Sequence, residues 1–367
     1  EILLGKWLGV NALVLVVVVL GGAAVYGLAY YLKSLPVQFE RDRYKVRDVV
    51  WTARVAAIPT PPIAQAEAAA RQLIRERVER GELTEVAEAD AARAKQIELL
   101  RLQRVVPDGE VRVYEFEGLA PPDIEDGVVQ VRYKAIGQPL TFDEMLEIGW
   151  VFCDPNTKAW LSEPIFTRER SNDVHQFLVR AGAVIKDGRA TLMVLNPPSE
   201  NDNAAYVFEG EKSLQILYTV GGFEANYLRS LLMLQLRLAL LSAVALFFAT
   251  FTSFPVACFC TLSFYVICMG SPFWYESIGA GLSPADTQVD PYGKFGPAVR
   301  LVLMPVLKFA FPDFARYDGV DLLIDGLVVP GSLLQLMVLH TLVYGLVLLL
   351  GVGWLIFSTR EVAEVQV

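Results

Sequence analysis

Histidine and cysteine are scarce in this chain of 367 residues, which contains two histidines and four cysteines. The histidines, His175 and His340, are far apart in the sequence, so a histidine-rich metal site is not expected. Only Cys153 lies outside the apolar segments, and a single cysteine cannot form a disulfide within its own domain. The sequence therefore predicts neither a metal site nor a disulfide framework.

Motifs for nucleotide binding and covalent catalysis are also missing. No glycine-rich loop is followed by Lys-Ser or Lys-Thr, so we do not expect this chain to bind ATP through a P-loop. No serine, cysteine or histidine cluster matches a nucleophile motif. The net charge of −9 lacks the basic footprint of a nucleic-acid-binding protein. We therefore expect no catalytic residues, no cofactor bound by this chain and no nucleic-acid partner.

Charge is missing from a long stretch near the start of the chain. No charged side chain lies between Lys6 and Lys33, and the whole chain is 54% hydrophobic but only 20% charged. The apolar core of a signal peptide is usually about 7–15 residues. The longer segment here predicts a retained transmembrane helix at 1–32. The small residues at 21–24 resemble a cleavage site, but we interpret them as a place of close helix packing.

Two further parts of the chain are apolar enough to enter a bilayer. Residues 227–271 predict a transmembrane helical hairpin that turns near 249–255, and residues 333–357 predict the last span. The intervening residues 272–332 predict an outer loop with an interfacial or re-entrant helix at 296–311. The count is four spans, which places both chain ends, including the tail 358–367, on one side. Lys6 and Arg360 favour the cytoplasm for that side.

The segment 33–226 is polar and predicts an extracytoplasmic domain with both helices and strands. Its Ala-, Glu- and Arg-rich part at about 63–105 keeps a helical period, which predicts a helical hairpin turning at Gly81. This hairpin is either a solvated arm or a coiled coil that docks a partner. Short strands and turn clusters at 107–220 predict a β-sandwich-like fold, and 39–55 predicts a further strand.

One turn within this β-rich part has a specific signal. Asp187-Gly188 lies between the apolar segments 179–185 and 190–195, and Asp-Gly tolerates the positive φ of a tight turn. We therefore predict a β-hairpin there. The complete fold prediction is a polytopic α-helical membrane protein with four spans. Its extracytoplasmic α+β domain is β-sandwich-like and carries an inserted helical hairpin.

Two ionisable residues lie inside the predicted spans and are candidate functional residues, because such residues are costly in a membrane. His340 is either a neutral histidine bonded to a neighbouring helix or part of a proton relay. Arg237 lies near the outer end of its predicted span, where its side chain can extend to the interface.

Two other polar sets have structural interpretations. Cys258, Cys260 and Cys268 lie in one apolar span without a nearby histidine or acid, so we interpret them as small core residues. Four aspartates lack the spacing of an EF-hand loop and are expected to be solvated or to cap helices. They are Asp313, Asp318, Asp321 and Asp325.

Several segments resemble permeases of ABC-2-type transporters, in particular bacterial members with a large extracytoplasmic insertion. The segment EILLGKWLG at 1–9 is similar to the entry into the third helix of such permeases, and GGFEANYLR at 221–229 is similar to the entry into a later span. FPDF at 311–314, DG at 325–326 and FSTRE at 357–361 resemble their closing part.

This resemblance implies six spans, cytoplasmic termini and a bacterial inner-membrane location. It also implies a second permease subunit, identical or different, and a separate ABC-type ATPase subunit that holds ATP and magnesium. Two helices and a cytoplasmic loop are then expected before Glu1, or on another chain. The resemblance also implies candidate contacts on the ATPase side, which are Glu1, Lys6, Thr250, Thr252, Ser253 and Phe254.

The leading hypothesis is therefore a membrane subunit of an ATP-driven exporter. In this hypothesis a partner ATPase shifts the packing of the spans, and the outer domain transmits that motion or recognises extracytoplasmic proteins. The alternative is a membrane-anchored scaffold or assembly subunit whose outer domain binds partner proteins without transport.

Overall fold

The computed structural model divides the chain into two compact units. Unit 1 comprises Glu1–Ala53 and Gly221–Val367, and unit 2 comprises Arg54–Val220, which lies within the predicted outer domain 33–226. The structure describes residues 2–36, 51–80, 88–123, 127–138, 145–198, 205–210, 212–275 and 304–359.

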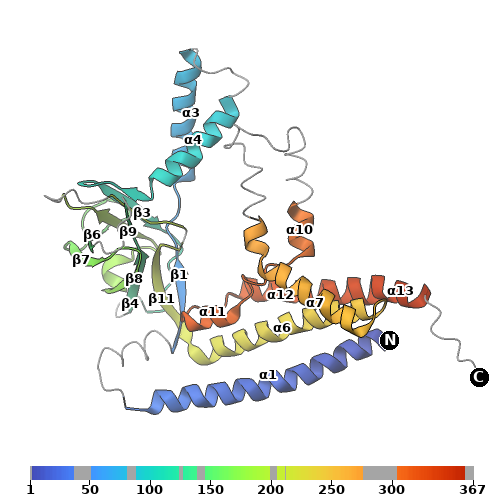
Figure 1. Ribbon diagram of the computed structural model, residues 1–367. Helices are drawn as coiled ribbons and strands as arrows, with labels where there is room; N and C mark the ends of the chain where they lie inside the picture. Colours follow the sequence, from blue (N-terminus) through green and yellow to red (C-terminus); the bar gives the residue numbers. More distant parts are fainter. Residues whose placement is uncertain are drawn as a thin grey trace, which may run out of the picture. The chain divides into compact units, whose positions relative to one another are not determined.

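Unit 1 is helical, and its helices come from both ends of the chain (Figure 1). They are α1 (Ile2–Ser34), α6 (Phe223–Ala249), α7 (Phe254–Met269), α10 (Met304–Ala310), α11 (Gly319–Ile324), α12 (Gly331–Tyr344), the π-helical η6 (Gly345–Gly353) and α13 (Trp354–Thr359). Within the described residues, α1 and α6 are long and apolar enough to cross a membrane, whereas α7 and α12 are shorter apolar helices. The predicted count of four spans stays a prediction.

Helices α1 and α6 pack side by side and run antiparallel (Figure 1). The Trp7 Nε1 donates to the carbonyl of Ala239 over 2.9 Å, and the Tyr227 hydroxyl donates to the carbonyl of Gly22 over 2.7 Å. A β-carbon added to Gly22 would lie 2.7 Å from Cδ1 of Leu231. The interpretation of the small residues at 21–24 as a close helix contact is thus confirmed at Gly22.

The predicted hairpin at 227–271 is formed by α6 and α7, which pack against each other. Helix α6 begins four residues earlier than the predicted segment, at Phe223. Pro255 lies in the first turn of α7, where its missing N–H leaves no hydrogen bond unmade. The predicted last span corresponds to α12, η6 and α13, which follow one another without a break.

The described residues of unit 2 form three sheets and two longer helices. Sheet A has the order β1-β11-β4-β8, sheet B the order β2-β10-β5 and sheet C the order β3-β9-β6-β7, and the strand pairs with an assigned register are antiparallel. The strands are β1 (Thr52–Ala57), β2 (Val105–Val106), β3 (Val111–Phe116), β4 (Val128–Lys134), β5 (Ile136–Gln138), β6 (Met145–Cys153), β7 (Ile165–Arg170), β8 (Val174–Arg180), β9 (Ala190–Leu195), β10 (Ala205–Val207) and β11 (Leu214–Gly222).

One hydrophobic core joins these sheets. Tyr133 of sheet A, Trp150 of sheet C and Tyr206 of sheet B all belong to it and are almost fully buried. The ring centroids of Tyr133 and Trp150 are 4.5 Å apart. Sheets A and C therefore share one core, which is the arrangement expected of a β-sandwich-like domain.

The hairpin predicted between 179–185 and 190–195 is wrong, although its turn is present. Asp187 and Gly188 have φ values of 51° and 70°, and the main chains of Lys186 and Arg189 hydrogen-bond across the turn. However, β8 ends at Arg180 and is followed by the short helix α5 (Ala181–Val184). Strand β8 pairs with β4, and β9 pairs with β3 and β6. Of the strand predicted at 39–55, residues 39–50 lie outside the described residues, and β1 covers Thr52–Ala57.

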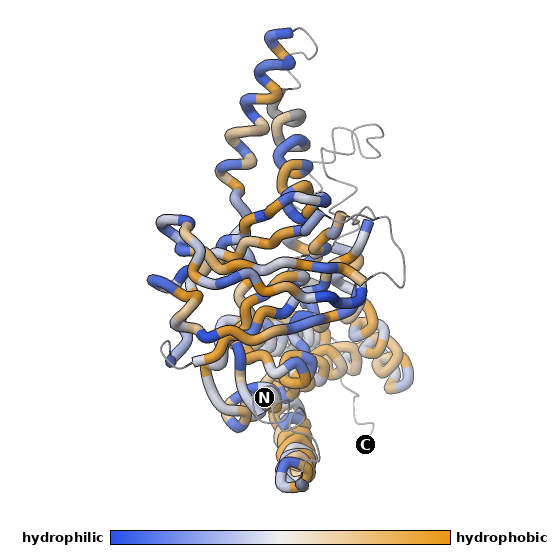
Figure 2. The backbone as a smooth tube through the Cα atoms, turned by 90° about the vertical axis from the view of Figure 1, so that its left-hand side faces the viewer, coloured by the Kyte–Doolittle hydropathy of each residue, from blue (hydrophilic) through white to orange (hydrophobic). Residues whose placement is uncertain are grey.

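The predicted helical hairpin is formed by α3 (Ile63–Glu79) and α4 (Glu88–Leu102), which pack against each other. Ala66, Ala70 and Ile74 recur every four residues along α3 and are its buried side chains. Hydrophilic and hydrophobic residues alternate along both helices (Figure 2). The turn predicted at Gly81 lies outside the described residues.

Candidate functional site

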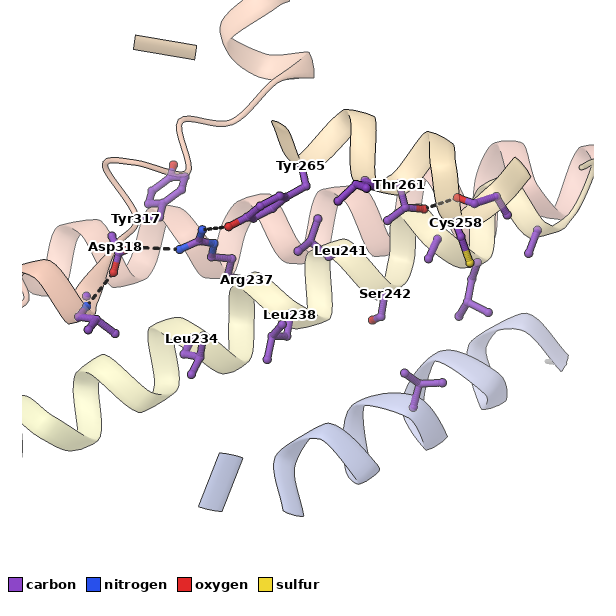
Figure 3. Close-up of a pocket in the computed structure, with 18 of the residues that line it drawn as sticks. Leu234, Arg237, Leu238, Leu241, Ser242, Cys258, Thr261, Tyr265, Tyr317 and Asp318 are labelled. Carbon is purple, nitrogen blue, oxygen red and sulfur yellow. Dashed lines mark hydrogen bonds and ion pairs between the residues drawn. The ribbon is translucent and has the colours of Figure 1, made fainter. Parts of the chain in front are cut away.

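A pocket of about 950 Å³ lies within unit 1, lined by α1, α6, α7 and α11. Most of its wall is apolar, and leucines of α6 such as Leu234 and Leu238 contribute much of it (Figure 3). The charged lining residues and Tyr265 lie toward α11, where Arg237 and Asp318 meet, whereas Ser242 and Thr261 are polar residues farther along the pocket. An apolar cavity with a few converging polar groups is the usual form of a ligand-binding site.

Arg237 is held at the middle of α6 by groups from two other segments. Its Nη1 lies 3.3 Å from Oδ2 of Asp318, and its Nη2 donates to the Tyr265 hydroxyl over 3.0 Å and to the Met269 sulfur over 3.1 Å (Figure 3). The guanidinium also lies 5.4 Å from the ring centroid of Tyr265 and 5.4 Å from that of Phe314. Arginine suits such a site because its planar group can bond and stack at once.

The sequence-based interpretation of Arg237 therefore needs two corrections. The residue lies at the middle of its helix rather than near an end, because α6 begins at Phe223. Its side chain is only 11% exposed and is paired within unit 1 instead of extending outward.

Asp318 has two roles. It caps α11, since its Oδ1 accepts hydrogen bonds from the main-chain N–H groups of Val320 over 3.0 Å and Asp321 over 3.4 Å. Its other oxygen, Oδ2, pairs with Arg237. The capping role predicted for the aspartates is thus confirmed at Asp318. In the described part of the chain, no three potential ligands are grouped to hold a metal ion.

Three contacts hold the irregular segment around α11 against α6 and α7. The Asn226 side chain accepts from the Val329 N–H over 2.8 Å and donates to the Leu327 carbonyl over 2.7 Å. Phe314 is fully buried, and its N–H donates to the Cys268 carbonyl. Of the predicted interfacial helix at 296–311, residues 296–303 are outside the described residues, and α10 covers Met304–Ala310.

His340 of α12 contacts the same segment. Its Nδ1 is 2.7 Å from the hydroxyl of Tyr317, and the two rings meet edge to face with centroids 5.7 Å apart. His340 is thus hydrogen-bonded, but its partner lies in the segment before α11 and not on a neighbouring helix, and both interpretations of its role stay predictions. Tyr317 also lines the pocket, so it connects His340 to the site.

The candidate ATPase-side residues that the structure describes lie at one end of the α1/α6 pair. Lys6 is exposed near the start of α1, and the turn 250–253 follows the end of α6. Because α1 and α6 are antiparallel, these two positions share an end. The Thr250 and Thr252 hydroxyls bond to carbonyls of the last turn of α6, Ser253 precedes α7, and the Phe254 side chain is 79% exposed. Glu1 lies outside the described residues.

The cysteines of α7 do not share one environment. Cys268 is buried, Cys260 is partly buried, and Cys258 is exposed and lines the pocket. Their interpretation as small core residues therefore holds for Cys268 and is wrong for Cys258.

Sequence reasoning missed the partners of Arg237. Asp318 was expected to be solvated or to cap a helix, and Tyr265 was counted only as part of an apolar span. A signal was present, because an arginine inside an apolar helix needs a counter-charge, and the aspartates at 313–325 are the acids that precede the last span.

Comparisons with protein-family models, with curated proteins and with solved structures found no match to this chain.

Proposed function

We propose that this chain is the permease subunit of an ATP-driven transporter of the exporter class, in the manner of the ABC-2-type permeases that its segments resemble. In this proposal the helices of unit 1 cross a bacterial inner membrane four times and unit 2 lies outside the cytoplasm. A separate ATPase subunit hydrolyses ATP, and a second permease subunit completes the membrane part.

The observation that supports this proposal most is the Arg237–Asp318 pair at the pocket wall. Charged residues inside a membrane are costly and mark substrate or ion pathways by default. Non-helical backbone at membrane depth is tolerated where it is buried in protein or lines a cavity. Asp318 lies in irregular backbone, yet it pairs with the middle of an apolar helix. A simple membrane anchor needs neither a charged pair within its apolar helices nor irregular backbone packed against them.

The two ends of the α1/α6 pair fit two different roles, one toward unit 2 and the other toward the ATPase. The chain leaves α1 toward unit 2 at Ser34 and returns to α6 at Phe223, so one end of this helix pair adjoins the entry to unit 2 in sequence. Lys6 and the turn 250–253 lie at the other end. A strongly exposed aromatic residue such as Phe254 is a common anchor in a protein interface. We therefore assign the ATPase contact to that end.

One observation favours the scaffold alternative. Sheet C presents apolar side chains on its outer face as well as its inner face, since Val111, Val113 and Phe166 are 40–55% exposed. A sheet with one solvated face usually alternates apolar and polar residues. Such a face suits a protein partner of unit 2, with or without transport.

Isolation of the chain from native membranes in mild detergent separates the two functions. The permease function predicts that an ABC-type ATPase is recovered with the chain and that its ATP turnover rises when the chain is present. A complex containing only extracytoplasmic proteins, with no ATPase, favours the scaffold.

Single-cysteine labelling in sealed vesicles tests the topology independently. A cysteine at Thr252 should react only from the cytoplasmic side, and a cysteine at Arg168 of β7 only from the opposite side. Reaction of both positions from the same side contradicts the proposed topology.

A further inference from the structure

We propose that the pocket of unit 1 binds a lipophilic cation, that is, a molecule with a large apolar body and one positively charged group. The inference rests on the proposed transport function for its biological role, because it names the substrate class of that same site. The binding itself is a property of the pocket and can be measured without an ATPase.

The apolar part of the ligand is assigned from the pocket walls. Three leucines of α6 line the pocket together with apolar residues of α7 and α1, and these residues are Leu234, Leu238, Leu241, Leu262 and Val10. Small residues of the two helices, such as Ala245 and Ala257, leave room between them. A volume of about 950 Å³ is that of a pocket for a drug-sized molecule.

The charge of the ligand is assigned from the polar end of the pocket. Arg237 is already paired with Asp318, and Asp321 adds a second carboxylate to the same wall. These three side chains carry a formal charge of −1 together. An anion there would face this net negative charge, whereas a cation would be attracted to it.

Aromatic groups at the same end strengthen the preference for a cation. Tyr265 and Tyr317 both line the pocket, and the Tyr265 ring already lies beside the Arg237 guanidinium. Tyrosine rings attract cations at their faces, and most strongly where water is excluded. The Tyr265 hydroxyl accepts a hydrogen bond from Arg237, so its own hydrogen remains available for a ligand acceptor.

Tetraphenylphosphonium and tetraphenylborate test the assignment, because the two ions are matched in size and shape and opposite in charge. Binding of each ion is measured on the chain in nanodiscs of neutral lipid, with empty nanodiscs subtracted. We expect the cation to bind about tenfold more tightly than the anion. The Asp321→Asn variant should remove most of this preference, while Asp325→Asn, at the C-cap of the same short helix but outside the pocket wall, should keep it.

A second pair of variants tests whether the ions occupy this pocket. Leu238→Trp fills the pocket and should reduce cation binding about tenfold or more. Leu228→Trp adds the same bulk at a side chain of α6 that is 66% exposed and does not line the pocket, so it should bind like the wild type. Thermal unfolding of each variant checks that it remains folded.

Several outcomes overturn the inference. Equal or tighter binding of the borate contradicts the charge assignment, and equal loss in both tryptophan variants contradicts the location. Exclusion of both ions from the wild type, with a change of oligomeric state in Leu238→Trp, would show instead that a helix of a second copy fills the pocket. If the cation binds but no ATPase is stimulated by the chain, the transport function is refuted and the cation site is retained. If an ATPase is stimulated but the two ions bind equally, the cation site is refuted and the transport function is retained.

Discussion

Arg237 and Asp318 are 81 positions apart in the chain, and Nη1 of the arginine lies 3.3 Å from Oδ2 of the aspartate. Their side chains are 11% and 24% exposed. The pair connects the middle of α6 to the N-cap residue of α11. It therefore fixes the geometry of the polar end of the pocket.

The first prediction concerns this pair. Asp318→Asn keeps a good N-cap but removes the negative charge, so Arg237 loses its counter-charge. Because the pair is partly exposed, we expect a loss of about 2–3 kcal/mol in the free energy of unfolding. The free energy of unfolding in detergent, measured for Asp318→Asn, Arg237→Met and the double variant, checks this. The double variant should lose less than the sum of the single losses, and strictly additive losses would show that the two residues do not interact.

The second prediction concerns the contact between α1 and α6. Gly22→Leu forces a side chain against Leu231 and should destabilise unit 1 by about 1–3 kcal/mol. Gly21→Leu is the matched control, because a β-carbon there has no atom within 4 Å. Thermal unfolding of both variants provides the measurement. An equal fall in melting temperature for the two variants would contradict the close packing at Gly22.

The third prediction concerns a polar contact in the core of unit 2. The Thr167 hydroxyl accepts hydrogen bonds from Trp150 Nε1 over 2.9 Å and from the Tyr133 hydroxyl over 3.0 Å. Thr167→Val leaves both donors unpaired and should cost about 2–4 kcal/mol. Thr167→Ser keeps the acceptor and should cost much less, and the free energies of unfolding of the two variants should therefore differ. A valine variant as stable as the serine variant would contradict this role.

The fourth prediction concerns stability at acid pH. The Asp154 carboxylate accepts from the N–H groups of Asn156 and Thr157 and from Lys186 Nζ, and these bonds hold its pKa well below the ordinary value. Because the folded state favours the charged form, this contribution is fully present above the ordinary pKa of about 3.9 and is lost as the pH falls below it.

Asp154→Asn removes this titrating group. Its unfolding midpoint should therefore change less than that of the wild type as the pH is lowered from 6 to 3. Midpoints measured across this range check the prediction. If the unfolding midpoints of the two proteins fall in parallel as the pH is lowered, Asp154 does not contribute to the loss of stability at acid pH.

Features encoded locally could be predicted from the sequence. The apolar segments near 5–32 and 228–248 became α1 and α6, and the period at 63–105 became α3 and α4, because helix formation depends on neighbours three and four residues away. The Asp187-Gly188 turn formed as its residue types predict. These features need no knowledge of distant parts of the chain.

Features that depend on distant residues could not be predicted. Strand β11 pairs with β4, and β8 pairs with β4 on its other side, whereas the local pattern favoured a hairpin between 179–185 and 190–195. Arg237 has its counter-charge on Asp318, and no local period marks that pairing. The charge alone indicated that a partner was needed, but long-range packing determined which one.

ATP turnover by the complex purified through this chain tests the central proposal most directly. We predict that an ATPase is recovered with the wild-type chain and hydrolyses ATP, and that Phe254→Ala, at the exposed first residue of α7, weakens its association about tenfold or more. Phe259→Ala is the matched control, because Phe259 is 70% exposed on the same helix but is not among the candidate contacts, and it should retain the ATPase. Recovery of no ATPase with the wild-type chain, or equal recovery with both variants, would contradict the account.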